Sequence, residues 1–209
     1  MKLVSLISSG IDSPVATYLM SKKAEKIILL HGDINPFTDN RTLDNFLKLA
    51  KHLKKISKTD IEVFILSHGK SLEKYKIKCE PKFTCIFCKR MLLRYAEAVC
   101  KKFNFDAIVM GDSLGQVASQ TLQNINTIES AIKTPVFRPL IGYDKQEIIK
   151  IAKEIGTYEL SILPSVGCTA VPNKPATEAK LEKIINEEGK IDINNLVDQI
   201  IKNLKIVKI

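Results

Sequence analysis

The chain has 209 residues, with 45% hydrophobic and 26% charged side chains and a formal net charge of +9, which is typical of one globular domain with room for a small appendage. No apolar run approaches the roughly 18 residues that span a bilayer. Asp12 and Pro14 interrupt the apolar N-terminus, so we expect neither a membrane protein nor a secreted one. Five loosely spaced cysteines do not form the even set of a disulfide framework, and they favour a reducing, cytoplasmic compartment.

Four short apolar runs rich in Val and Ile predict strands that are buried on both faces. They are residues 2–8, 26–32, 61–67 and 106–112. Apolar residues recur at helical spacing within 43–53 and again in the segment that Asp144 opens. This alternation predicts an α/β fold, a parallel sheet with helices on both faces, whose ligands bind at the carboxyl ends of the strands.

The segment "SSGIDSP" follows the first predicted strand and precedes a helix. Its small residues, including Ser8, Ser9, Gly10 and Ser13, let backbone N–H groups approach an anion, and the helix N-terminus adds a favourable dipole. The segment therefore predicts a phosphate-binding loop, although it lacks the Walker A pattern. An ordinary serine N-cap is the alternative.

Residues 70–102 carry ten basic and three acidic side chains, so most of the net charge lies there. A solvated lysine face would explain this charge, but a surface that contacts nucleic-acid phosphates is favoured by the cysteine pair that lies beside it. That pair, Cys85 and Cys88 in "FTCIFCKR", has the spacing used in zinc sites, redox dithiols and iron–sulfur sites. Cys79 and Cys100 are most simply structural.

The fourth predicted strand runs into "GDSLGQVASQT", residues 111–121. Asp112 at its carboxyl end is a candidate for a metal or substrate contact, and the alternative is an N-cap for a helix starting near Leu114. After residue 175 we expect a helix over about 176–188, a turn at "EEGK" and a second helix ending near Leu204. We therefore expect a main domain over 1–175 and a helical extension over 176–209 that packs on it.

Five blocks of sequence carry a resemblance to a known family. "SGIDSPVA" resembles the S-G-G-x-D-S loop of the PP-loop ATP pyrophosphatases, which cut ATP between its α- and β-phosphates. Together with "CIFCKRML", "GDSLGQVASQT", "FRPLIGYDKQEIIKIAKEIGTYELSI" and "GCTAVPNKPAT", it makes residues 1–177 similar to the catalytic domain of the tRNA 4-thiouridine synthetase family. This implies the Rossmann-like fold of adenine nucleotide alpha hydrolases. Ser9, Asp112 and Gly167 depart from the family's usual residues.

The resemblance implies an ATP-dependent sulfurtransferase that adenylates O4 of a tRNA uridine and replaces it with sulfur, giving 4-thiouridine, AMP and pyrophosphate. Its implied catalytic residues are Asp12, Asp112 and Cys168, and its implied cofactors are ATP and Mg²⁺. The implied ATP contacts are Ser8, Ser9, Gly10, Asp12, Ser13, His31, Gly111, Gln116 and Arg138. Lys145 joins Arg138 as a candidate to stabilise phosphate charge, although a surface salt bridge explains it equally well.

Cys85, Cys88 and Cys168 match the positions at which some members of the family hold a [4Fe–4S] cluster. Three thiolates leave one iron open, where a hydrosulfide can bind. Other members use the cysteine that matches Cys168 to release sulfur from a rhodanese domain, which these 209 residues lack, so the cluster is favoured. Zinc, which would need a fourth ligand, and free or redox thiols are the alternatives.

Full-length members of the family usually hold tRNA with ferredoxin-like and THUMP domains, and no such segment precedes the phosphate loop here. We expect a stand-alone catalytic domain that acts on tRNA, with help from a separate RNA-binding protein as an alternative. A sulfide or persulfide donor is a further expected partner, and a homodimer is left open. Alternative functions are thiolation of another RNA position or of a small heterocycle, and a non-catalytic nucleotide-binding subunit.

Overall fold

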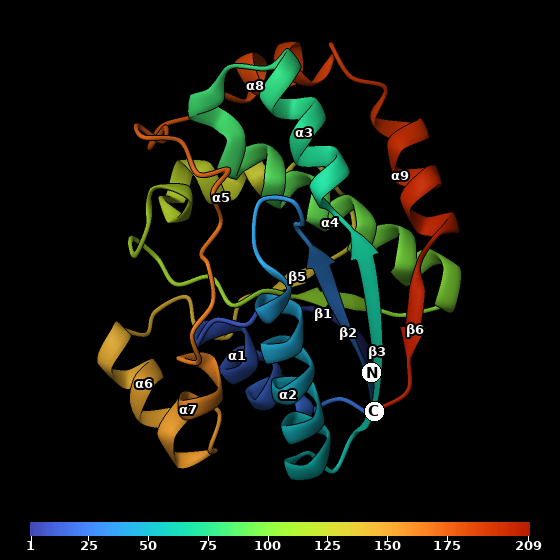
Figure 1. The fold of residues 1–209 in the computed structure, drawn as a ribbon, viewed down its shortest axis with the longest axis vertical. Helices are drawn as coiled ribbons and strands as arrows, with labels where there is room; N and C mark the ends of the chain where they lie inside the picture. Colours follow the sequence, from blue (N-terminus) through green and yellow to red (C-terminus); the bar gives the residue numbers. More distant parts are fainter.

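A computed structural model describes residues 1–209 and places a six-stranded sheet between two layers of helices (Figure 1). The strands are β1 Lys2–Leu6, β2 Lys26–Asp33, β3 Asp60–Ser67, β4 Ala107–Val109, β5 Val136–Phe137 and β6 Lys205–Val207. Their order is β5-β4-β1-β2-β3-β6, and every neighbouring pair is parallel except β3 and β6. The predicted parallel sheet is confirmed, and the chain switches direction across the sheet at β1, where such folds bind ligands.

Helices cover both faces of the sheet, as the alternating pattern predicts. They are α1 Asp12–Ser21, α2 Asn40–Ile56, α3 Gly69–Lys78, α4 Thr84–Phe103, α5 Leu122–Glu129, α6 Lys145–Glu154, α7 Tyr158–Ser161, α8 Leu181–Glu188 and α9 Ile193–Lys202. In Figure 1, α1, α2, α6 and α7 lie below the sheet, and α3, α4, α5, α8 and α9 lie above it. None of these helices is long and apolar enough to cross a membrane.

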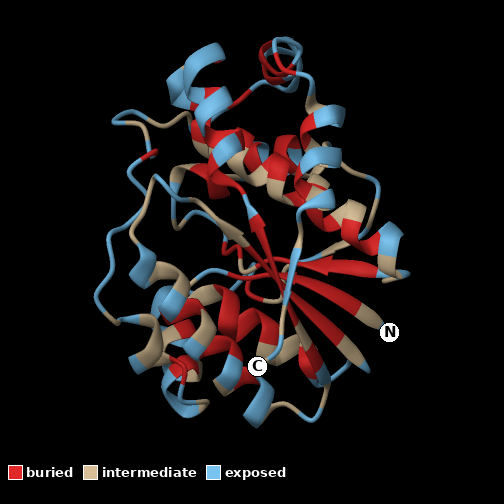
Figure 2. Ribbon diagram, turned by 45° about the vertical axis from the view of Figure 1, so that its right-hand side comes forward, coloured by how far each residue is buried: buried red, intermediate tan, exposed pale blue.

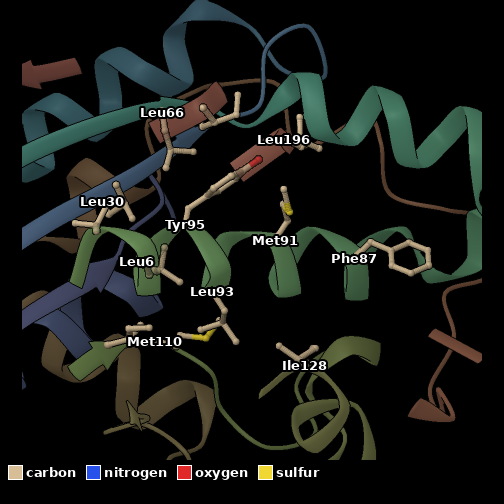
Figure 3. Packing of buried hydrophobic residues seen from close by; sticks show 14 of the residues in the cluster. Leu6, Leu30, Leu66, Phe87, Met91, Leu93, Tyr95, Met110, Ile128 and Leu196 are labelled. Atoms are coloured by element: carbon tan, nitrogen blue, oxygen red, sulfur yellow. The ribbon is translucent and has the colours of Figure 1, made fainter. Parts of the chain in front are cut away.

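The strands are buried on both faces because their successive side chains point to opposite sides of the sheet. Ile27 and Leu29 of β2 belong to the apolar cluster between the sheet and helices α1 and α2. Ile28 and Leu30 belong to the cluster between the sheet and α4. Figure 2 shows this burial concentrated in the strands and in the inward sides of the helices. Figure 3 shows the layer above the sheet, where strand residues such as Leu30 meet α4 side chains.

The prediction of a helix that starts near Leu114 is wrong, and Asp112 therefore does not act as its N-cap. After β4 the chain runs through irregular structure, with Gly115 at φ +77°, to a short 3₁₀ turn at Ala118–Gln120 and then to α5. Thr121 caps α5 instead, since its side chain accepts a hydrogen bond from the backbone N–H of Asn124. The Asp112 carboxylate is occupied by other partners, described below.

The C-terminal segment also differs from the prediction at both ends. Residues 176–180 are not helical, because the Asn124 side chain bonds the backbone of Ala176 and Ala179 and holds this stretch against α5. The second helix, α9, ends at Lys202, and the chain then adds β6 to the edge of the sheet, antiparallel to β3. Apolar residues of α8 and α9 belong to the same cluster as the residues of β1 and β2 above the sheet.

Candidate active site

The carboxyl ends of β1, β2 and β4 border a cavity of about 340 Å³. The loop 8–13 after β1 forms one wall, His31 and Gly32 of β2 form a second, and Gly111 and Asp112 after β4 form a third. This is the edge of the sheet at which the sequence predicts ligand binding. Seven of the nine residues expected to contact ATP line the cavity, namely Ser8, Ser9, Gly10, Asp12, Ser13, His31 and Gly111.

The loop 8–13 is folded by its own serines. Ser13 Oγ accepts a hydrogen bond from the backbone N–H of Ser8 at 2.9 Å, and Gly10 N–H donates to Ser8 Oγ at 3.2 Å. Gly111 packs so tightly here that a Cβ atom on it would lie 2.8 Å from the backbone nitrogen of Ser13. Because no side chain caps the N-terminus of α1, its first N–H groups are available to an anion in the cavity.

A lysine from a distant helix reaches the phosphate loop. Lys145 Nζ lies 2.5 Å from Asp12 Oδ1, and both side chains are partly exposed. Lys145 is the first residue of α6, and the Asp144 N-cap with its capping-box partner Glu147 fixes where that helix begins. The arrangement places a positive charge beside Asp12, which itself lines the cavity.

Asp112 is the centre of a buried charged cluster. Its carboxylate accepts hydrogen bonds from Lys89 Nζ at 2.7 Å, Arg138 Nε at 3.2 Å and Gln120 Nε2 at 3.3 Å. Burial acts to raise the pKa of Asp112, but Lys89, Arg138 and Gln120 outweigh it and hold that pKa below its ordinary value. Arg138 also pairs with Glu129. The Asp112 carboxylate is therefore ionised and presents Lys89 and Gln120 to the cavity, which both residues line.

The wall that β2 provides is apolar and rigid. His31 is buried, its Nδ1–H donates to the backbone oxygen of Ile7 at 2.9 Å, and its ring stacks on Phe46 with centroids 4.2 Å apart. Burial lowers the pKa of His31, so the ring is neutral. Leu30 and Leu92 line the same part of the cavity. A flat, uncharged ring of a ligand suits this wall.

The loop that carries Cys168 is fastened to the segment that follows β2. Thr169 N–H donates to the backbone oxygen of Phe37 at 2.9 Å, and Thr38 Oγ1 donates to that of Val166 at 2.6 Å. Further along the chain, Ala176 N–H donates to the backbone oxygen of Lys82, near the start of α4. The loop thus bridges the β2 side of the site to the helix that carries the cysteine pair.

Cys85 and Cys88 lie in the first turns of α4, and Cys168 is exposed on its loop. Burial raises the pKa of both helix cysteines, that of Cys88 to about 12. Thr84 and Thr169, the chain neighbours of Cys85 and Cys168, line the same surface groove, so the Cys168 loop lies beside the start of α4. His68, fully buried and neutral because burial lowers its pKa to about 3, places Nε2 3.1 Å from Cys88 Sγ. Cys79 and Cys100 are buried elsewhere in the core, as the sequence predicts.

Three thiols are the candidate ligands for a metal group on this side of the cavity. No group of three or more His, Cys, Asp or Glu side chains is arranged to hold one ion, as the closed four-ligand zinc site would require. Iron–sulfur clusters are held by cysteine thiolates. Cys85, Cys88 and Cys168 are all thiols, the ligand that such clusters take.

Comparisons with known proteins agree with this geometry. The family model described as thiamine biosynthesis protein (ThiI) matches residues 1–193. The chain belongs to the ThiI family. Relatives named probable tRNA sulfurtransferase include one from Methanosarcina mazei, 38% identical over all of this chain and 52% of its own, and one from Methanocaldococcus jannaschii, 41% identical over 92% and 50%. The ThiI-family chain thus spans about half the length of the curated relatives it matches.

Solved structures show the same likeness. A 4-thiouridine synthetase in complex with RNA and bound ATP superposes with a TM-score of 0.93, at 33% identity, over 99% of this ThiI-family chain and 55% of that chain. An NMN synthetase from Francisella tularensis, 14% identical over 95% of this chain and 76% of its own with a TM-score of 0.58, shares the fold alone.

Several predicted site residues of the ThiI-family chain lie away from the cavity wall. Arg138 reaches it only through Asp112, and Gln116 lines a neighbouring pocket. Sequence reasoning missed Lys89 and Gln120, which line both pockets. A signal for Lys89 was present, because it follows Cys85 by four residues and so shares its face of α4.

The basic segment 70–102 is less exposed than its charge implies. Arg90 and Arg94 are turned inward, where both bind the Glu188 carboxylate through two hydrogen bonds each at 2.7–3.0 Å. Lysines of the segment remain outside. Two of them, Lys76 and Lys82, join Lys174 in lining a surface groove of about 590 Å³ between the start of α4 and the loop after Cys168.

Proposed function

We propose that the chain is the catalytic part of an ATP-dependent tRNA sulfurtransferase that converts a uridine to 4-thiouridine. One observation carries the proposal: the phosphate loop with Asp12, and Asp112 with its partners Lys89 and Gln120, line a single cavity at the switch point of the sheet. The match to a 4-thiouridine synthetase with bound ATP supports it. The tRNA substrate is supported by the names of the curated relatives.

The reaction needs two displacements, because oxide cannot leave a pyrimidine ring. In the first, uridine O4 attacks the α-phosphorus of ATP, the bond to the bridging oxygen breaks, and pyrophosphate leaves while N3 gives up its proton. In the second, hydrosulfide attacks C4, the C4–O4 bond breaks, and AMP leaves with the uridine oxygen. The residues must therefore neutralise developing phosphate charge and hold two nucleophiles in turn.

The residues present suit the first displacement. Backbone N–H groups of the loop 8–13 and of the first turn of α1 would bind the phosphates, and Lys145 would stabilise the charge that develops on them. Asp12 faces the same space and would hold Mg²⁺, which usually takes one or two carboxylates together with phosphate oxygens. The adenine ring fits the apolar wall at His31 and Leu92.

The cysteines that would serve the second displacement lie on α4, which also lines this cavity through Lys89, and on the loop beside it. Cys85, Cys88 and Cys168 would hold a [4Fe–4S] cluster, which supplies an iron with an open position for a sulfur donor. Lys89 connects the two sides, since its charge acts on both helix cysteines while its Nζ is paired with Asp112. The RNA would approach along the lysine groove beside Thr84 and Thr169, neighbours of Cys85 and Cys168.

Anaerobic reconstitution tests the proposal. The chain is loaded with iron and sulfide and incubated with ATP, Mg²⁺, sulfide and tRNA that lacks 4-thiouridine, and the nucleosides and nucleotides are measured by mass spectrometry. We expect 4-thiouridine and AMP in equal amounts, and neither from Asp12→Ala. Formation of ADP, or thiolation of a different nucleoside, would contradict the proposal.

A further inference from the structure

A second pocket opens beside the nucleotide cavity and shares three of its residues, Asp12, Lys89 and Gln120. It has a volume of about 500 Å³, and Gln116, Val117, Ser119 and Lys145 line the rest of it. We name it the acceptor pocket. Because it adjoins the phosphate loop, a group bound in it would lie next to the phosphates of ATP.

Gln120 is held in the wall of both pockets with one atom unused. Its side chain is buried, with 7% of the residue exposed, and its Nε2 donates to Asp112 Oδ1 at 3.3 Å. Its Oε1 is buried and has no hydrogen-bond partner. The orientation of the amide is fixed, because the ionised carboxylate of Asp112 can only accept and so must face the NH₂ group. A buried acceptor left unpaired is unfavourable, so a ligand that donates to it recovers that free energy.

Gln116 adds a complementary atom to the same pocket. Its Nε2 is a buried donor without a partner. An unused acceptor on Gln120 and an unused donor on Gln116 together match a group that presents an N–H beside a carbonyl. The imide edge of uracil has this pattern, with N3–H next to a carbonyl oxygen. Cytosine has an acceptor in place of N–H at N3, so only its exocyclic N4–H₂ could donate to Gln120.

The sheet order separates this pocket from the adenine end of the nucleotide. Gln120 follows β4, whereas Ile34 and Thr42, at the far end of the nucleotide cavity, follow β2. Since β1 and its phosphate loop lie between β4 and β2, a base held by Gln120 lies across the phosphates from the adenine wall. A nucleophile that attacks the α-phosphorus must lie opposite the leaving pyrophosphate, so the inference requires the α-phosphate to lie between the acceptor pocket and the pyrophosphate.

We infer that the acceptor pocket binds the target uracil, and that Gln120 selects it by accepting a hydrogen bond from N3–H. The inference rests on the proposed function, because it assigns the base that this function activates. Gln120 is a specificity residue: without it a uracil would still reach the phosphates, but the pocket would no longer distinguish a base with N3–H from one without.

The test compares RNAs that carry uridine or 3-methyluridine at the target position, using wild type, Gln120→Met and Gln120→Ala. AMP formation and RNA binding in the presence of a non-hydrolysable ATP analogue are both measured. We expect wild type to favour uridine by about 100-fold or more, as sites built to bond a substrate N–H do. Gln120→Met keeps the volume of the side chain but loses the acceptor, so the ratio should fall at least tenfold through a slower uridine reaction. Gln123→Ala, at an exposed position three residues away, should keep the wild-type ratio.

Four results would overturn the inference. If exclusion of the methyl group were the only cause of selectivity, Gln120→Met would keep the wild-type ratio. If Gln120 recognised adenine instead, its variants would raise the KM for ATP and leave the ratio unchanged. Equal binding of the two RNAs by wild type, with AMP formed only from uridine, would overturn the inference while leaving the proposed function intact. No AMP from either RNA and no binding preference between them would overturn both.

Discussion

Lys145 Nζ lies 2.5 Å from Asp12 Oδ1 although 133 residues separate them in the chain. The contact exists because α6 packs beside α1 under the sheet, and because the capping box of Asp144 and Glu147 begins α6 at Lys145. It brings a positive charge to a loop whose own residues carry none. The pair is therefore the part of the site in which local helix capping and long-range packing both act on the chemistry.

Removing the charge of Lys145 should slow the first displacement. We expect Lys145→Met to lower the rate of AMP formation about 100-fold, the usual effect of removing one group that stabilises transition-state charge. The rate is measured by single-turnover release of pyrophosphate. Lys150→Met, an exposed lysine on the same helix, should leave the rate unchanged. A Lys145→Met protein with the wild-type rate would show that the contact is only a surface salt bridge.

The buried ion pairs of Glu188 should matter for stability rather than for chemistry. Glu188 binds Arg90 and Arg94, joining α8 to α4, and Arg90 also donates to the backbone oxygen of Thr127 in α5. We expect Glu188→Gln to lower the free energy of unfolding by about 3 kcal/mol, because it leaves buried guanidinium charges without their partner. Glu182→Gln, at an exposed position on α8, is the matched control and should have little effect.

The same pair predicts a pH dependence. Burial acts to raise the pKa of Glu188, but hydrogen bonds from Arg94 and Arg90 outweigh it and lower that pKa below the ordinary value of 4.5. A carboxylate whose pKa is lowered by folding stabilises the protein above its unfolded pKa and loses that effect as the pH falls toward the folded pKa. The melting temperature of wild type should therefore drop more steeply below pH 4.5 than that of Glu188→Gln. Parallel curves for the two proteins would contradict this assignment.

The three proposed cluster ligands should be separable from the two structural cysteines by metal content. After anaerobic reconstitution we expect Cys85→Ser, Cys88→Ser and Cys168→Ser each to lose most of the bound iron and sulfide and the absorbance near 400 nm. Cys100→Ala, which changes a buried thiol at the far end of α4, should keep them. Stoichiometric zinc in a colourless anaerobic preparation, or iron content that survives loss of Cys168, would contradict the cluster.

The sheet could be predicted from the sequence because each of its main strands is marked by a short pattern of neighbouring residues. Each of the first four strands is an apolar run bounded by polar residues, and the phosphate loop lies where one run meets a helix. The edge strand β6 could not be predicted, since it has only three residues and exists through pairing of Val207 with Val63 across the sheet. The start of α8 was missed for a similar reason, because the Asn124 side chain holds residues 176–180 in a non-helical path.

The site divides in the same way. Asp12 and the serines of the loop follow from a short motif, but the partners of Asp112 come from 23 and 26 residues away, at Lys89 and Arg138. From the sequence alone, the Asp112 carboxylate could therefore be interpreted as the N-cap of a helix, and the structure has no helix there. The count of basic residues also implied that Arg90 is exposed. Arg90 is buried instead, because it pairs with Glu188, which lies 98 residues away in the chain. Residue type identified the candidates, and tertiary contacts assigned them to solvent, core or cavity.

The central claim is that uridine O4 becomes the leaving oxygen carried away by AMP, and isotope transfer tests it most directly. The RNA is prepared with oxygen-18 at O4 of the target uridine, and the AMP formed with ATP, Mg²⁺ and sulfide is analysed by mass spectrometry. The account predicts AMP that carries one oxygen-18 atom on its phosphate, in an amount equal to the 4-thiouridine formed. Thiolation accompanied by unlabelled AMP would contradict it.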